Sequence, residues 1–192
     1  MDDTELDTVS SKYRRGEHMS NDKPGKREYS GGAVNTFVLG LAQSQGVINK
    51  ILSDVGISKL DPNAWYDFEL AERVFLEAQK ALGRAAVRQC GKLMIESAEY
   101  PPEINSVKTL LAGLGQWYSY HARGPNVGTI TCEFEDEQSA TLDWSTGRFP
   151  CAFCMGILEG AAARYGVKPL IEHGNDGCRD TGASTCIYHV NW

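Results

Sequence analysis

The sequence lacks several features that would assign a function directly. It has no excess of basic residues: Lys and Arg number 19 against 25 Asp and Glu, a formal net charge of −6. Nucleic-acid binding needs a positively charged surface, so we expect no nucleic-acid partner. No apolar run approaches the roughly 18 residues that span a bilayer, which excludes a membrane span. The first residues are acidic, so we expect no signal peptide and a cytoplasmic location.

Familiar catalytic motifs are also missing. The glycine pair Gly31-Gly32 lacks the Lys and Ser/Thr of a phosphate-binding loop. There is no Gly-x-Ser-x-Gly nucleophile elbow and no internal repeat. The sequence therefore favours a non-enzymatic role, although it leaves the question of turnover open.

The chain is of single-domain size at 192 residues. Residues 1–30 mix acidic and basic side chains with few large apolar ones, which predicts a largely disordered tail. We expect residues 31–192 to form one α+β domain.

The hydrophobic period changes along that domain. Apolar residues at three- and four-residue steps predict helices over about 33–55, 68–82, 87–99 and 107–117. A period of two then predicts a hairpin over 130–134 and 140–144. A helix over 151–165 and strands over 167–173 and 186–192 complete the chain. This order predicts N-terminal helices packed on an antiparallel sheet, with a C-terminal helix and hairpin closed by a metal site.

Cysteine placement suggests the metal site. Cys90 and Cys132 stand singly in apolar-periodic segments, as small core residues do. The other four gather near the C-terminus: Cys151, Cys154, Cys178 and Cys186. In a reducing compartment such a cluster favours metal binding or thiol chemistry over disulfides. His173 adds a nitrogen donor of the kind that tetrahedral zinc sites use. Plain buried thiols and redox chemistry stay open as alternatives.

Glycine and cysteine spacings in the C-terminal half match a known family. The matching stretch is Cys151-Ala-Phe-Cys-Met-Gly156-Ile-Leu-Glu-Gly160, then Arg164-Tyr165, Lys168-Pro169, Cys178 and Cys186. It resembles the 4-vinyl-reductase, or hydrocarbon-binding, domain family, and is similar to the effector domain of phenol-responsive transcription activators. The resemblance covers residues 130–192 well, and 31–129 only in the order of elements.

The resemblance implies a structural zinc held by Cys151, Cys178 and Cys186. Where the family has a carboxylate as fourth ligand, this chain has Asn175, a poor zinc ligand. The candidates for that place are His173, Asp176 and Cys154. We favour His173, because imidazole is the better zinc donor. A site without an open position would stabilise the fold rather than catalyse.

The resemblance also implies an apolar cavity between the helices and the sheet. The family's phenol-binding Trp and His do not align here, but the chain has candidates of its own: Trp117, Tyr120, His121 and Trp144. An apolar pocket with one or two polar anchors is the usual form of a small-molecule site. His121 could hydrogen-bond a ligand or act as an axial haem ligand. Core packing of the tryptophans, and local carbonyl partners for His121, are the simpler alternatives.

We therefore expect a domain that binds or senses a small apolar or aromatic molecule, or haem or another tetrapyrrole, and that contains structural zinc. Its output would pass through a homodimer or a partner protein. Two alternatives stay open: an accessory or reductase-like protein in tetrapyrrole metabolism, and a ligand-free protein-interaction adaptor.

Overall fold

The structure is a computed structural model that describes residues 25–192. Most of the predicted tail, residues 1–24, lies outside the described residues. The last three residues of the predicted tail, Glu28–Ser30, form a strand, β1.

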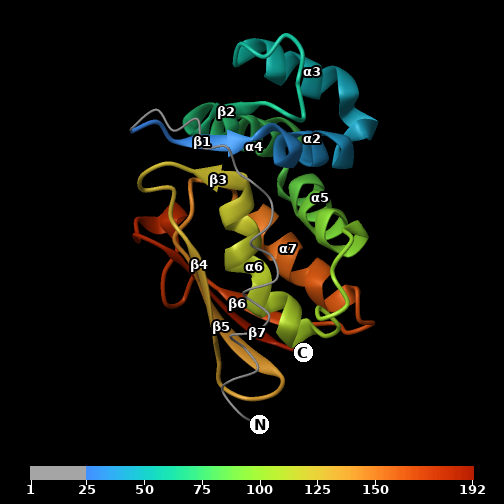
Figure 1. The fold of residues 1–192 in the computed structure, drawn as a ribbon, viewed down its shortest axis with the longest axis vertical. Coiled ribbons are helices and arrows are strands. Elements are labelled where there is room, and N and C mark those ends of the chain that lie inside the picture. The colour runs from blue at the N-terminus through green and yellow to red at the C-terminus, as the bar shows by residue number, and fades with distance from the viewer. Residues whose placement is uncertain (1–24) are drawn as a thin grey trace.

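The described residues form six α-helices and two antiparallel sheets (Figure 1). The helices are α2 (Gly31–Gly40), α3 (Gln45–Asp54), α4 (Phe68–Leu82), α5 (Arg84–Ser97), α6 (Val107–His121) and α7 (Cys151–Ala163). The strands after β1 are β2 (Trp65–Asp67), β3 (Ala122–Arg123), β4 (Ile130–Phe134), β5 (Ser139–Trp144), β6 (Leu170–His173) and β7 (Cys186–Asn191), and short 3-10 turns cover Ala42–Ser44 and Arg179–Thr181. The α+β prediction is confirmed. Among residues 25–192 no helix is long and apolar enough to cross a membrane.

The first predicted helix is interrupted. The apolar period continues from Phe37 to Val55, but the structure ends α2 at Gly40 and begins α3 at Gln45. A Cβ on Gly40 would lie 2.6 Å from Sγ of Cys90, so close packing against α5 requires a glycine there. Glycine is a weak helix former, and the helix breaks beside it.

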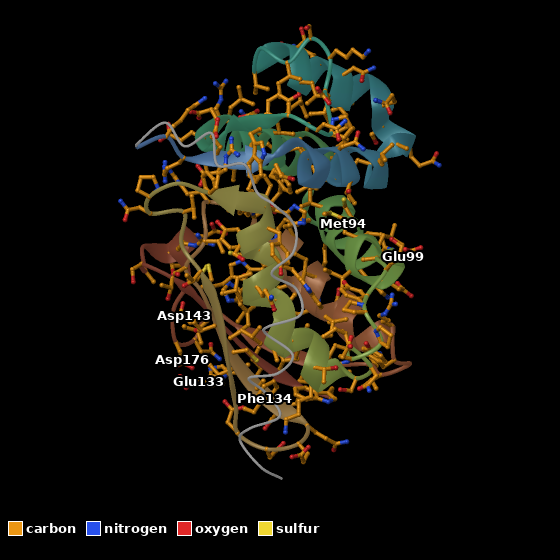
Figure 2. All side chains as sticks on the ribbon, in the orientation of Figure 1. Met94, Glu99, Glu133, Phe134, Asp143 and Asp176 are labelled. Carbon is orange, nitrogen blue, oxygen red and sulfur yellow. The ribbon has the colours of Figure 1, made fainter. Side chains whose placement is uncertain are left out.

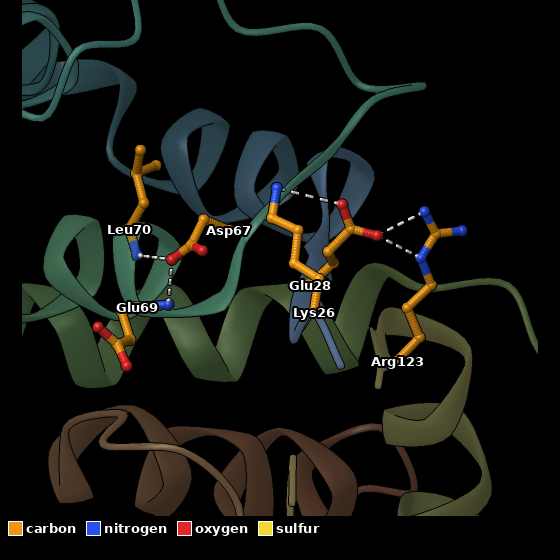
Figure 3. Close-up of polar contacts among 6 residues, drawn as sticks. All are labelled: Lys26, Glu28, Asp67, Glu69, Leu70 and Arg123. Carbon is orange, nitrogen blue, oxygen red and sulfur yellow. Dashed lines mark hydrogen bonds and ion pairs between the residues drawn. The ribbon is translucent and has the colours of Figure 1, made fainter. Parts of the chain in front are cut away.

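Side-chain caps begin two of the other helices. Ser106 caps α6 in a capping box with Thr109. Asp67 caps α4 by accepting hydrogen bonds from the backbone N–H groups of Glu69 and Leu70 (Figure 3). Both caps satisfy backbone donors that have no partner inside the helix.

The smaller sheet, in the order β2-β1-β3, was not predicted from the sequence. Its strands are only two or three residues long, too short for an alternating pattern. Arg123 on β3 donates to the carboxylate of Glu28 on β1 at 2.8 Å, and Lys26 Nζ lies 3.5 Å from the same carboxylate (Figure 3). These contacts attach the C-terminal end of α6, and with it His121, to the first strand.

The larger sheet has the order β4-β5-β7-β6 and contains both predicted hairpins. Its inner face is apolar and lies against α6 and α7 (Figure 1). Figure 2 shows Glu133, Asp143 and Asp176 on the opposite side, away from these helices. The pairing of Trp144 with Cys186 across β5 and β7 places a predicted cavity residue beside a predicted metal ligand.

Helix α7 crosses α5 with direct backbone contact. A Cβ on Gly156 would lie 2.0 Å from the carbonyl oxygen of Arg88, and a Cβ on Gly160 would lie 2.4 Å from that of Lys92. Real Cβ atoms do not approach so closely, so only glycine allows this crossing. The contact fixes the position of α7, the one helix that contributes to both of the sites described below.

Candidate functional site

A cavity of about 340 Å³ lies between α2, α5, α6, α7 and the larger sheet. The structure brings all four sequence-predicted ligand-binding residues to its wall: Trp117, Tyr120, His121 and Trp144. They come from α6 and β5, which are far apart in sequence. Their proximity is a structural observation, and ligand binding by them stays a prediction.

The cavity has an apolar floor and a polar mouth. Buried side chains form the floor: Tyr29, Leu114, Trp144, Phe149, Phe153 and Cys154. Exposed residues form the mouth: Thr36, Glu99, Tyr120 and His121. Met94 and Glu99, labelled in Figure 2, mark its α5 side. A dry floor with a few polar groups at one end is the form that small-molecule sites take.

His121 is held by the N-cap residue of α2. Its Nδ1 lies 3.1 Å from Oγ of Ser30, which also accepts a hydrogen bond from the backbone N–H of Ala33. Although the imidazole reaches the surface, crowding by its neighbours removes water and lowers its pKa. The ring is therefore neutral at pH 7. Depending on the tautomer, Nε2 can offer either a proton or a lone pair to a ligand.

Tyr120 provides a second polar group at the mouth, with 46% of its surface exposed. Its hydroxyl accepts a hydrogen bond of 2.9 Å from the side-chain amide of Gln116. The hydroxyl proton can then be donated to a ligand. Tyr118, the other tyrosine at this end of α6, donates instead to the carbonyl oxygen of Val127.

Sequence reasoning missed most of the floor. Tyr29 comes from β1, Phe149 from the loop before α7, and Phe153 and Cys154 from α7 itself. Tyr29, Phe149 and Phe153 pack with other rings as in any aromatic core, with Tyr29 and Phe149 centroids 5.0 Å apart. No local signal distinguishes a ring that faces a cavity from one that faces the core.

The second site is a group of four potential metal ligands. The ligand atoms of Cys151, His173, Cys178 and Cys186 all lie within 4.8 Å of one another. Sγ of Cys151 lies 3.7 Å from Sγ of Cys178 and 3.7 Å from Sγ of Cys186. Tetrahedral zinc with Zn–S bonds of about 2.3 Å requires sulfur atoms roughly 3.8 Å apart. The thiols already have this spacing.

His173 completes the group in a manner typical of a ligating imidazole. Its Nδ1 lies 2.8 Å from the backbone carbonyl oxygen of Ile187, whereas its buried Nε2 has no hydrogen-bond partner among the described residues. Donation from Nδ1 fixes the tautomer and leaves the lone pair on Nε2. The ring stacks on Tyr188 with centroids 4.1 Å apart, and Tyr188 in turn meets the ring of Trp144 at 5.8 Å.

The other two candidates for fourth ligand lie outside the group. Asp176 has its carboxylate 2.5 Å from Nε2 of His189. Cys154, one helical turn after Cys151, lines the cavity instead. The structure therefore brings together the four residues favoured by the sequence, and metal binding by them stays a prediction.

The thiols do not titrate alike. Hydrogen bonding from Cys151 lowers the pKa of Cys186, helped by the backbone N–H and guanidinium of Arg179, both 3.4 Å from its sulfur. The same interaction, together with burial, raises the pKa of Cys151. The lowered pKa favours the thiolate at Cys186, and the thiolate is the form that ligates metals.

Comparison with sequences gives no family. No protein-family model matches the chain, and no curated protein matches it.

Comparison with solved structures gives a fold. The chain is similar to an H-NOX protein from S. oneidensis in its Fe(II)NO ligation state, with 18% identity, a TM-score of 0.64, and coverage of 84% of this chain and 98% of that one. It is also similar to a T. tengcongensis H-NOX variant, at 16% identity and a TM-score of 0.64, covering 84% and 96% of the two chains. An oxygen-binding H-NOX domain related to soluble guanylate cyclases matches at 16% identity and a TM-score of 0.62, covering 84% and 92%. At this identity the likeness shows the fold alone.

These findings overturn the resemblance to the 4-vinyl-reductase family, since no family model matches and the solved neighbours are H-NOX domains. The spacings that carried it have local causes. Gly156 and Gly160 are required by the α5–α7 crossing. Cys151, Cys178 and Cys186 meet in one thiol group. Such packing demands do not specify a family.

Proposed function

We propose that this chain is a small-molecule-binding sensor domain, whose ligand occupies the cavity between α6, α7 and the larger sheet. The cavity supports this most directly, because an apolar floor ends in two polar side chains able to orient a ligand. The H-NOX neighbours add weight, since several are described by the iron or gas ligand that they hold. Haem or another tetrapyrrole is therefore one ligand class to be tested.

The proposal includes a structural metal site at Cys151, His173, Cys178 and Cys186, with zinc as the metal. Three sulfurs and one imidazole nitrogen form a donor set that zinc prefers, and they leave no position for substrate. Zinc there would hold the loop before β7 against the start of α7 and so stabilise the fold. Thiolate ligands require a reducing compartment, so the proposal keeps the cytoplasmic location.

A sensor needs an output, and we propose that it passes through a second copy of this chain or a partner protein. Sedimentation of the purified protein with and without ligand tests the first possibility. A monomer under both conditions leaves the partner protein as the route.

Extraction of the purified full chain tests the cavity proposal. Organic extraction followed by mass spectrometry is expected to release one small molecule at near-stoichiometric amount from the wild-type protein. Leu114→Trp, which fills the floor, should release much less, while Leu39→Trp on exposed α2 surface should release the same amount. Equal recovery from both variants, or none from the wild type, would contradict the proposal and favour the ligand-free adaptor.

A further inference from the structure

We infer that the ligand of this cavity is smaller than a tetrapyrrole and carries no carboxylate, an inference that rests on the proposed function. Size, charge and the position of the polar groups support it separately.

The volume of the cavity limits the size of the ligand. At about 340 Å³ it lies near the lower end of the roughly 300–1,000 Å³ range of small-molecule pockets. A ligand of one or two fused rings fits a pocket of this size, whereas a tetrapyrrole macrocycle joins four pyrrole rings in one flat disc.

The side chains of the cavity wall are packed too tightly to move apart for a larger ligand. The ring of Trp117 packs on that of Tyr100 with centroids 4.6 Å apart, and Trp144 is 3% exposed and packs edge-on against Tyr188. Moving either indole would separate aromatic pairs and expose apolar surface. Interiors this closely packed resist such expansion.

The charges around the cavity disfavour an anion. No Lys or Arg belongs to its wall, whereas the carboxyl-bearing Glu99 stands at the mouth. Arg123, two residues after His121, is occupied by the carboxylate of Glu28. Arg164 lies over the ring of Tyr100 but donates to two backbone carbonyls at 2.8 Å. A bound carboxylate would therefore lose its hydration without gaining a cation.

Haem could therefore use His121 as an iron ligand, but it does not suit the cavity around that residue. The neutral imidazole of His121 could ligate an iron through Nε2. The macrocycle is larger than the one- or two-ring ligand that such a pocket suits, and its two propionates find no Lys or Arg in the cavity wall. The polar groups suit instead a compact aromatic or alicyclic molecule, with one hydroxyl or amine at the mouth between His121 and Tyr120.

Three probes test the inference on the purified full chain. 1-Naphthol is compact and uncharged, 1-naphthoate has nearly the same size with a carboxylate, and haemin is a tetrapyrrole dicarboxylate. Titration calorimetry and quenching of Trp117 and Trp144 fluorescence should show 1-naphthol binding with one site per chain. 1-Naphthoate should bind at least about tenfold more weakly, because its charge is left unpaired. Haemin should give no stoichiometric Soret band.

Variants locate the binding. Thr36→Trp places an indole at the mouth without disturbing the core, and should weaken 1-naphthol binding about tenfold or more. Asn35→Trp, on the same helix but outside the cavity wall, should leave it unchanged. Equal loss in both variants, or in neither, would show binding elsewhere and overturn the inference.

The remaining outcomes separate the inference from the proposed function. Stoichiometric haemin binding, with a Soret band that is lost in His121→Ala, would overturn the inference and leave the sensor proposal standing. Equal affinities for 1-naphthol and 1-naphthoate would also overturn it. If no probe binds and extraction yields no molecule, the proposed function fails and the inference fails with it.

Discussion

One helix contributes to two regions of opposite character. Cys151 at the start of α7 belongs to the thiol–imidazole group, while Phe153 and Cys154 in the next turn face the cavity. The first region is closed, with four ligand atoms already at mutual distances that suit one ion. The second is open at its mouth and leaves the ligand's shape partly unspecified. Under the proposed function, the first region would stabilise the fold and the second would select the ligand.

Removing one ligand of the thiol–imidazole group should have the largest effect on the free energy of unfolding. Cys178→Ser takes one thiolate from the site, and we expect loss of stoichiometric zinc and a free energy of unfolding about 4 kcal/mol lower. In a chain of this size that corresponds to a fall in Tm of about 10 °C. Elemental analysis and thermal unfolding measure both.

The control for this variant is Cys154→Ser. This thiol lies one turn along the same helix but outside the group, so zinc content should be unchanged. A metal-free Cys178→Ser protein with wild-type Tm would show that the group does not stabilise the fold.

Disturbing the helix that joins the two regions should come next. In Gly156→Ala the new methyl would meet the carbonyl of Arg88, and we expect about 3 kcal/mol of destabilisation as α7 moves away from α5. Denaturant unfolding gives the value. Gly46→Ala in α3 has open space around its Cβ and should stabilise slightly. If Gly156→Ala proves as mild as Gly46→Ala, the close crossing of the helices is wrong.

Removing a side chain from the cavity wall should lower the free energy of unfolding by less. Trp117→Ala removes a half-buried indole from the cavity wall, with an expected cost of about 2 kcal/mol. Zinc content should not change, because α6 contributes no ligand to the thiol–imidazole group. Parallel loss of zinc in this variant would show that the two regions are not independent.

The smallest expected effect is on the pH dependence of folding stability, through His121. Because the pKa of His121 is lowered in the folded protein, protonation favours the unfolded chain. This residue adds nothing to the pH dependence above its unfolded pKa, and stability is lost as the pH falls from about 6.5 towards the lower folded value. In His121→Gln, denaturation curves between pH 7 and pH 5 should show a shallower loss of stability than in the wild type. Identical slopes would contradict the lowered pKa of the imidazole.

The two regions also differ in how far the sequence predicted them. Residue chemistry pointed to the C-terminal cysteines and to His173, because few side chains ligate zinc. The choice of Cys151, Cys178 and Cys186 came from a family resemblance that the comparisons overturn, although the structure does bring these residues together. Sequence could not separate Cys151 from Cys154, because helical spacing puts both on one side of α7. Only the tertiary packing shows that Cys154 is sealed in an apolar environment that raises its pKa to about 12.

The cavity was predicted only at its α6 side and at Trp144. Its floor depends on contacts between segments far apart in sequence, such as Tyr29 against Phe149, and these carry no periodic signal. The small sheet was also missed, because its strands are too short to show an alternating pattern. The predicted starts of two helices, at residues 68 and 107, agree with the starts of α4 and α6, because the apolar period there is a local signal.

Tyr188 lies between the two regions. One of its neighbours is the imidazole of His173, and another is the indole of Trp144. A single tyrosine side chain therefore packs against one residue of each region, Trp144 on one side and His173 on the other. The position of each of these two rings depends on the same phenol ring between them.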